Sequence, residues 1–541
     1  MDAKVSPIDM VEDQLQEQEL IDNPNKMAET TFQGVVTSEI QDAIDYIDNN
    51  ISDERNLASQ YYHGEPFGDE EEGRSSVVSM DVRDTVQSIL PSLMKVFTSG
   101  EKVVEFVPTG AEDVAMAEQA TDYINHVFMQ QNKGLTLMYN AFKDALIRKA
   151  GVIKFYWDDS KEVVTETYTD LTQEAANLLM QDDDVYASAL KEKPVGEPIM
   201  VQPAVMDEMG NVVQEPVLEQ PMAYDLELKR EITKGRIKCE ALPPEEFLID
   251  RRAKSLEEAT IVAHRKMATV SELVAMGYDF DEVMKHAGED FQFDTNSEFY
   301  TRNPVATVQG LTAKDDANKR VLYIEAYVRA DYDGDGIAEL RKVCTMGDAY
   351  EVFRNEPFDH MPFAAFCPDP EPHTFFGQSL ADITMDIQRI KSAILRNQLD
   401  SLAQSIHPRM AVVEGQANLE DVLNSEVGGI IRMRAPNMVQ SFSQPFVGQQ
   451  AFPMMAYMDE VKQSRTGINR AASGLDADAL QSTTKTAVAA TVTAARQHVE
   501  LIARIFAETG MTDLFKGLLK LSILHQDKPT MFRLRGDFVS D

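Results

Sequence analysis

Apolar residues recur at helical spacing near the start of the chain. Four isoleucines follow a Ser38-x-x-Gln41 capping pattern at intervals of four and three residues: Ile40, Ile44, Ile47 and Ile51. This pattern predicts an amphipathic helix with one buried stripe. A second helix is predicted from about Ser79, with Pro91 inside it. The preceding residues, 1–34, are polar, acidic and aperiodic, which favours a loose tail.

The longest helical patterns lie in the last third of the chain. A helix of about 28 residues, or about 42 Å, is predicted from Ser379 to Ile406 and ends at His407-Pro408. A second begins near Pro453 and runs to about Arg470, and a third ends at Gly510. Their apolar seams repeat at intervals of three and four, so the helices can pack within one domain or against neighbouring subunits.

Strand patterns are interleaved with these helices. One strand is predicted over 152–157, and hairpins over 226–239, with a turn near Lys234-Gly235, and over 321–352. Short strands at 410–413 and 428–433 separate the first two long helices. Residues 170–222 are acidic and rich in Gln, Met and Pro, which indicates an insertion or exposed arm. We therefore expect an α+β fold.

Charge divides the chain unevenly. The 51 basic and 90 acidic residues give a net charge of −39. Residues 371–541 hold 17 basic and 18 acidic residues, which leaves 34 and 72 for residues 1–370, a net of −38. Such a surface repels phosphate and excludes a DNA reader with a basic face. This negative charge is typical of an acidic soluble protein. It is also what a protein wall next to DNA would need if it must not bind the DNA tightly.

Most signatures of catalysis and of membrane insertion are absent from the sequence. There is no phosphate-binding P-loop and no H-E-x-x-H motif, and three widely spaced cysteines exclude a disulfide scaffold. Gly377-Gln378-Ser379 only partly matches a nucleophile elbow and predicts a helix start capped by Ser379. No apolar run approaches the roughly 18 residues of a membrane span, and no secretory leader is evident. We expect neither an enzyme nor a membrane protein.

One motif in the sequence has the residue types and spacing of a cation-binding loop. Asp331, Asp333 and Asp335, followed by Gly336, match the first half of a calcium loop. The twelfth position is Lys342 instead of a bidentate Glu, and Glu339 stands at the ninth. Asp and Gly are also what a tight hairpin turn requires. A turn alone, a bound Ca²⁺ or Mg²⁺, and a Ca²⁺-dependent hydrolase using the three aspartates are the competing interpretations; no other cofactor is expected.

A polar link between the second and third long helices offers a possible contact with DNA. It is rich in hydroxyl side chains and carries one cation next to them: Gln481, Ser482, Thr483, Thr484 and Lys485. Such groups can touch phosphates without reading bases. The alternative is a solvated loop that leads into a helix cap.

Several stretches together resemble the portal proteins of short-tailed bacteriophages. They are Gly73–Ser79 with Asp84–Met94, Lys102–Phe106, Leu242–Asp250 with Ala263–Arg265 and Met276–Tyr278, Asp333–Glu339, and Phe375–Leu380. In this order and spacing they are fairly specific. The resemblance covers about residues 38–540.

The resemblance implies a portal fold and a division of the chain. The implied parts are a flexible acidic tail (1–34), a mixed α/β wing (35–378), stem helices (379–406 and 450–470), a clip (407–449), a tunnel loop (471–484), a long wing helix (485–510) and the start of a helical crown (511–541). The crown stops early, so it is either short or truncated. In the clip, Arg409, Glu414, Arg432 and Arg434 are expected to face partners.

The implied function is structural, not enzymatic. Twelve copies are expected to form a ring at one capsid vertex, through which double-stranded DNA is packaged and ejected. Expected partners are the major capsid protein, the terminase large subunit, tail adaptor proteins and, without sequence preference, DNA. The ring is expected in the virion, after assembly in the host cytoplasm. The alternative is another head–tail adaptor or minor capsid protein.

Overall fold

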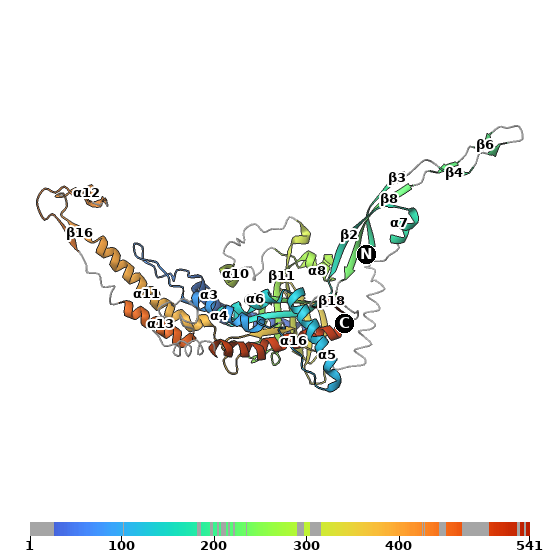
Figure 1. Cartoon of the computed structure of the whole chain (residues 1–541), viewed down its shortest axis with the longest axis horizontal. Helices are drawn as coiled ribbons and strands as arrows, with labels where there is room; N and C mark the ends of the chain where they lie inside the picture. Colours follow the sequence, from blue (N-terminus) through green and yellow to red (C-terminus); the bar gives the residue numbers. More distant parts are fainter. Residues whose placement is uncertain are drawn as a thin grey trace.

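The computed structural model shows a mixed α+β body with two projections, which confirms the predicted fold class (Figure 1). It describes residues 26–100, 102–180, 185–194, 199–202, 205–206, 212–214, 217–219, 222–233, 235–288, 297–302, 315–424, 426, 428–442, 451–467, 497–526, 531–534 and 537–540. Among these residues, no helix combines the length and the apolar character that a bilayer span needs.

The first half of the body is helical. Its elements are α2 (Glu29–Tyr46), a π turn (Ile47–Ile51), α3 (Ser52–His63), α4 (Asp81–Thr98), α5 (Val114–His126), a second π turn (Val127–Gln131) and α6 (Gly134–Arg148). The predicted isoleucine stripe is confirmed, since Ile40 and Ile47 are buried. The predicted helix start is wrong: α2 begins at Glu29, within the predicted tail, and Ser38 lies inside it. Gln33 explains the earlier start, because its side chain bonds to the backbone of Tyr350 and Val352.

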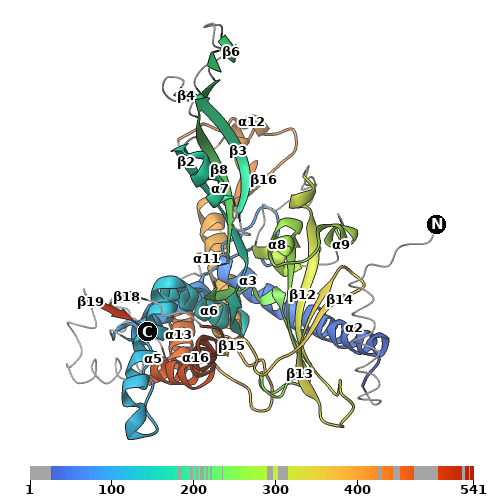
Figure 2. The same ribbon diagram turned by 90° about the vertical axis from the view of Figure 1, so that its right-hand side faces the viewer.

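A five-stranded antiparallel sheet forms the other side of the body (Figure 2). In spatial order it contains β10 (Phe247–Ile249), β11 (Ile261–Thr269), β12 (Arg320–Ala330), β13 (Glu339–Met346) and β14 (Glu351–Pro357). The short helices α8 (Val270–Ala275) and α9 (Phe280–Lys285) pack at this sheet, and α10 (Ser297–Arg302) packs against α3. The pairing of β12 with β13 confirms the predicted hairpin over 321–352.

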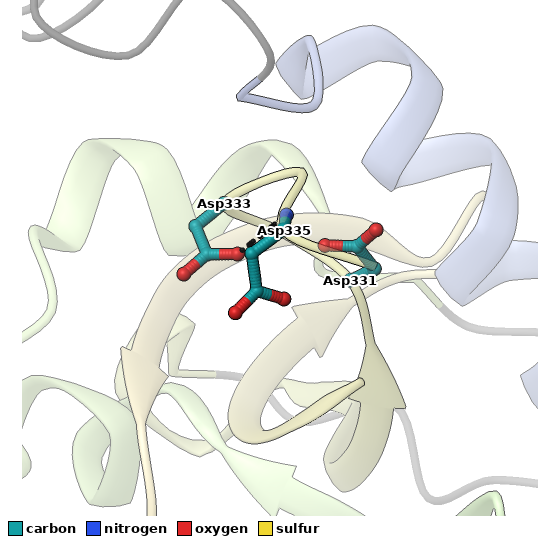
Figure 3. Close-up of side chains that lie close together, drawn as sticks. All are labelled: Asp331, Asp333 and Asp335. Carbon is teal, nitrogen blue, oxygen red and sulfur yellow. Dashed lines mark hydrogen bonds between the residues drawn. The ribbon is translucent and has the colours of Figure 1, made fainter. Parts of the chain in front are cut away.

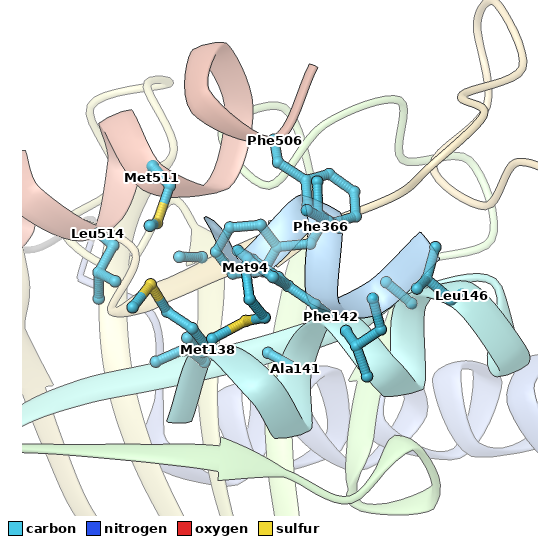
Figure 4. Close-up of a cluster of buried hydrophobic side chains, with 14 of the residues drawn as sticks. Met94, Met138, Ala141, Phe142, Leu146, Phe366, Phe506, Met511 and Leu514 are labelled. Carbon is cyan, nitrogen blue, oxygen red and sulfur yellow. The ribbon is translucent and has the colours of Figure 1, made fainter. Parts of the chain in front are cut away.

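A three-stranded sheet lies between the helices and the five-stranded sheet. Its order is β15 (Phe363–Phe366), β1 (Gly151–Asp158) and β9 (Arg236–Leu242). A core of Phe and Met side chains packs between this sheet, α4, α6 and the C-terminal helices (Figure 4). Phe142 of α6 lies 4.9 Å from Phe506, centroid to centroid, so the last third of the chain returns to complete this core.

The predicted hairpin at Lys234-Gly235 is wrong. β8 (Met222–Thr233) and β9 run on in the same direction, pairing with β2 (Lys161–Leu171) and β1 respectively. Asp158 of β1 pairs with Arg236 of β9, and Lys161 of β2 pairs with Thr233 of β8. The register of the strand pairing is therefore the same on both sides of the junction. Gly235 serves a different purpose from a turn: a Cβ there would lie 2.4 Å from the Trp157 ring.

The acidic insertion belongs to an arm that projects from this continuous ribbon (Figures 1 and 2). β3 (Val185–Pro194) adds a third strand, and α7 (Gln173–Leu179) packs over Leu226 and Leu228. Farther out lie the short pairs β4 (Ile199–Gln202) with β7 (Val217–Glu219), and β5 (Val205–Met206) with β6 (Val212–Gln214). This agrees with the prediction of an exposed arm.

The second projection contains the long helices (Figure 1). α11 (Leu380–Ile406) confirms the predicted helix, and Ser379 caps it as expected, since its Oγ accepts the Asp382 N–H at 3.1 Å. α13 (Phe452–Thr466) packs along α11 and ends at Gly467, in the left-handed region. We call α11 with α13 the stem, and residues 407–442 between them the clip.

The described residues of the clip form a small hairpin, β16 (Arg409–Val412) with β17 (Val439–Phe442), and the helical turn α12 (Leu419–Leu423). The predicted strand over 428–433 is wrong: β17, six residues farther on in the chain, is the partner of β16. Within this stretch only Met433 forms a bridge, to Ala417.

The predicted helix end at Gly510 is also wrong. Residues 497–506 are helical, a π turn (Ala507–Met511) follows, and α16 (Thr512–His525) continues the chain to a short hairpin of β18 (Met531–Leu534) and β19 (Asp537–Ser540). Gly510 is needed for close packing, because a Cβ there would lie 2.4 Å from the Phe366 ring.

Candidate functional site

The stem and clip have almost no core of their own. Among the described residues from 393 to 457, none is buried. Thirteen large apolar side chains in this range are exposed: Leu399, Leu402, Ile406, Met410, Val413, Leu419, Leu423, Ile430, Met433, Phe442, Phe452, Met454 and Tyr457. Such a concentration of exposed apolar side chains in one part of the chain favours an interaction site.

The predicted apolar seam of α11 divides at its middle. Leu380 and Ile387 are buried against the body, whereas Ile390 is 41% exposed. No residue of α11 beyond Ser392 is buried. The proximal half of the helix therefore belongs to the body, and the distal half projects from it.

The same region is close to electrically neutral. Residues 393–457 contain four basic residues (Arg396, Arg409, Arg432, Arg434) and five acidic ones (Asp400, Glu414, Glu420, Asp421, Glu426), a net of −1. This contrasts with the net of −38 over residues 1–370. Copies of the chain can approach one another at the stem with little like-charge repulsion.

The four clip residues predicted to face partners are all exposed. Arg432 also has a role within the clip, because its guanidinium donates to both carboxylate oxygens of Asp421, at 2.7 and 2.9 Å. This contact lowers the pKa of Asp421 to about 2 and ties α12 to the opposite side of the clip. Arg409 lies in β16 opposite Phe442. The predicted DNA-contacting residues 481–485 lie outside the described residues, and that assignment stays a prediction.

A charged network joins the stem to the body, and sequence reasoning missed it. Asp81 at the start of α4 is 1% exposed. Its Oδ1 accepts hydrogen bonds from Lys391 of α11 and Lys462 of α13, both at 2.7 Å. Lys391 also donates to Asp459 at 2.7 Å. The one sign of this network in the sequence is Lys391, a charged residue next to Ile390 of the apolar seam of α11.

Buried polar groups continue this junction along α11. The Gln388 side chain accepts the Val82 N–H at 2.9 Å and donates to the Tyr61 carbonyl at 2.8 Å. Ser392 Oγ accepts the Ser79 N–H at 2.9 Å. The stem is thus held on the body by directional polar contacts as well as by packing, which fixes the position of α11 along its own axis.

The three aspartates of the calcium-loop motif do come together (Figure 3). Their carboxylates lie at the turn between β12 and β13, and one oxygen from each falls within 4.8 Å of the others. Oxygens of these carboxylates accept backbone N–H groups of the turn: Asp331 from Gly334 and Gly336, Asp333 from Asp335, and Asp335 from Ile337. Glu339 accepts the Tyr332 N–H, at 3.1 Å. These contacts favour the turn interpretation and leave a cation as a hypothesis.

Titration with Ca²⁺ tests this hypothesis. Because the carboxylates already satisfy the turn, we expect no saturable heat up to millimolar Ca²⁺ in isothermal titration calorimetry. Saturable binding that Asp333→Asn removes and Asp348→Asn leaves unchanged would establish the cation site. Asp348 serves as the control because it lies at the next turn of the same sheet.

The chain is similar to a known protein family. A family model described as the phage SU10 portal protein matches residues 32–540 of the chain. The match includes the body, the arm, the stem and the clip.

Proposed function

Because the chain belongs to the phage SU10 portal protein family, whose role at the virion portal vertex is structural, we propose that twelve copies form a ring that conducts double-stranded DNA into and out of the capsid. In this proposal the clip docks the terminase large subunit during packaging and the tail adaptor proteins afterwards. The body, as wing, faces the major capsid protein. Assembly takes place in the host cytoplasm.

The main support for this proposal is that no described residue from 393 to 457, in the stem and clip, is buried. A pair of helices whose distal parts bury nothing is marginal on its own, because helices in water are stabilised mainly by tertiary packing. Neighbouring copies can supply that packing. In a closed ring one face of each copy meets a different face of the next, and the stem offers two candidate faces, with Leu402 on α11 and Tyr457 on α13.

The charge of the chain supports the conduit, because residues 1–370 are strongly acidic and the stem and clip, close to neutral, carry no excess of basic residues. Each phosphate neutralised by Lys or Arg releases counterions and adds affinity, so an acidic protein retains DNA weakly and lets it slide. The proposed tunnel loop, with Gln481, its hydroxyl side chains and Lys485, would touch the backbone sparsely. No base-reading surface is required.

Light scattering and variants that introduce charge into the stem test the ring. We expect a mass of about 727 kDa, twelve times the 60.6 kDa of one chain. Leu402→Asp together with Tyr457→Asp should shift the mass to that of smaller species, because charge would enter an apolar interface. Circular dichroism should keep the helical signal of the body and lose at most that of the distal stem, which is no longer packed. Leu178→Asp is the matched control, since this 71% exposed leucine lies on α7, outside the stem.

Two results would contradict the proposal. The first is a wild-type chain that remains a monomer or dimer at high concentration. The second is a full-sized ring formed by the Leu402→Asp/Tyr457→Asp variant, which would show that the exposed stem surface is not the contact between copies.

A further inference from the structure

Residues 65–80, between α3 and α4, lie beside the distal half of α11 and contain no helix or strand (Figure 1). We call this segment the strap. The strap is relevant to the position of the stem because no residue in the distal half of α11 is buried. Several contacts join the strap to Ser392, at the middle of α11, and to Arg396 and Asp400 of this half.

One arginine of α11 binds the strap at several points. The Arg396 guanidinium donates to Asp69 at 2.9 Å, to Glu70 at 2.5 Å and to the Val77 carbonyl at 3.0 Å. It also lies over the Phe67 ring, 5.2 Å from the centroid. Arg396 thus joins the beginning of the strap to its end.

Two further contacts use backbone N–H groups of the strap. Ser75 donates to Asp400 at 2.7 Å, and Ser79 donates to Ser392 at 2.9 Å. The acceptors are spaced along α11 on both sides of Arg396. Side chains of the helix therefore replace the secondary-structure partners that the strap backbone lacks.

These contacts are polar and partly open to water. The side chain of Asp69 is 53% exposed and Val77 is 44% exposed, whereas the side chains of Arg396 and Glu70 are 13% and 19% exposed. The apolar support is the Phe67 ring, which packs against Tyr61 at 5.0 Å. Ion pairs in such a setting contribute little each and weaken as salt is added. The Asp81 network at the base of the stem differs, since it is buried.

We propose that the strap is an electrostatic latch, which fixes the distal half of α11 to the body when closed and frees it when its ion pairs are weakened. The buried network around Asp81 then acts as the pivot, and the strap sets the position of the stem beyond it. The latch is a property of a single chain. Its test therefore gives an answer whether or not the chain forms a ring.

Hydrogen exchange measured by mass spectrometry on the full-length protein tests the latch. Peptides that cover residues 65–80 should be protected at about 0.05 M salt and exchange about fivefold faster or more at about 0.5 M. Arg396→Gln should give the faster exchange at both salt concentrations. Peptides from α4 should not change in either case, because that helix belongs to the buried core.

Two variants make the test specific. Glu71→Gln removes an exposed ion pair with Arg74 inside the strap and leaves α11 untouched, so exchange should equal that of the wild type. Ser75→Cys with Asp400→Cys should form a disulfide that closes the latch and abolishes the response to salt. Equal exchange of the strap in the wild type and in Arg396→Gln at both salt concentrations would overturn the proposal, as would a salt response that survives the disulfide.

Discussion

Replacing Lys154 by methionine is expected to lower the free energy of unfolding by about 3–5 kcal/mol, because it leaves a buried carboxylate without its closest cation. Lys154 lies on β1 and is 3% exposed. Its Nζ donates to Glu325 Oε2 of β12 at 2.9 Å, across the boundary between the two sheets. The change removes the charge and leaves a side chain of similar length.

The surroundings of Glu325 explain why the loss is large. Glu325 Oε1 accepts a short hydrogen bond from Tyr327 and lies 3.3 Å from Lys342 Nζ. Burial alone raises the pKa of Glu325, but the charges of Lys154 and Lys342 and the hydrogen bonds outweigh it, so the pKa lies well below its ordinary value. Lys342 alone cannot replace Lys154, because it lies on the far side of the carboxylate.

The same lysine also determines the protonation of a buried histidine. Lys154 Nζ lies 3.2 Å from His264 Nδ1, and an ammonium group only donates, so Nδ1 accepts. The ring proton is therefore on Nε2, which donates to Glu246 Oε2 at 3.2 Å. Burial and the charge of Lys154 lower the pKa of His264, in agreement with a neutral ring. Burial, together with nearby Glu240, raises the pKa of Glu246 to about 7.

Denaturant unfolding at several pH values checks the prediction and its cause. The lowered folded-state pKa of Glu325 stabilises the wild type above the ordinary value of 4.5, and this stability is lost as the pH falls below it. The deficit of Lys154→Met should therefore be largest near neutral pH and shrink in acid.

A neighbouring lysine provides the control for this experiment. Lys238→Met removes a 44% exposed lysine of β9, which lies 3.9 Å from Asp158, and should cost less than about 0.5 kcal/mol. A cost for Lys154→Met no larger than that of Lys238→Met would show that the buried pair is not what holds the two sheets together.

The parts of the fold that were predicted correctly depend on local signals. α11 was recognised because Ser379 caps it, the apolar spacing runs through it and His407-Pro408 follows it. These signals act within a few residues and are visible in the chain itself. The family resemblance was found for the same reason, from short stretches in a fixed order.

The errors arise where a distant contact determines the role of a residue. Gly235 and Gly510 carry the local signal of a turn and of a helix end, yet each serves to admit an aromatic ring, Trp157 or Phe366. The charged pairs were missed for the same reason: 171 residues separate Lys154 from Glu325, and 310 separate Asp81 from Lys391. Neither separation leaves a periodic pattern.

Replacing Asp81 by alanine is expected to lower the free energy of unfolding by about 3 kcal/mol or more and to loosen the stem from the body. Its Oδ1 is shared by Lys391 and Lys462, and its Oδ2 accepts the Ser79 hydroxyl at 2.6 Å. Burial raises the pKa of Asp81, but the hydrogen bonds from Lys391, Lys462 and Ser79 outweigh it, so the net shift is downward and the carboxylate stays charged. Its loss leaves two lysines with the Asp459 carboxylate alone.

Denaturant unfolding and hydrogen exchange of α13 measure this effect, and the stem offers a matched control. Arg465 of α13 also pairs with an aspartate of α11, Asp386, at 2.7 Å, but both side chains are substantially exposed, 42% and 53%. Asp386→Ala breaks a salt bridge between the same two helices and should cost less than about 0.5 kcal/mol. If Asp81→Ala unfolds at the same denaturant concentration as Asp386→Ala, Asp81 does not anchor the stem.

A second substitution separates the anchoring role of Asp81 from a general effect of altering α4. In Asp81→Ala the main cost is the excess positive charge of Lys391 and Lys462, so removing one of these charges should recover part of the stability. We therefore expect Asp81→Ala/Lys462→Met to be more stable than Asp81→Ala alone, with slower exchange in α13. Additive losses in the double variant would mean that Asp81 and Lys462 contribute independently, and the stem would then be held by packing and not by this network.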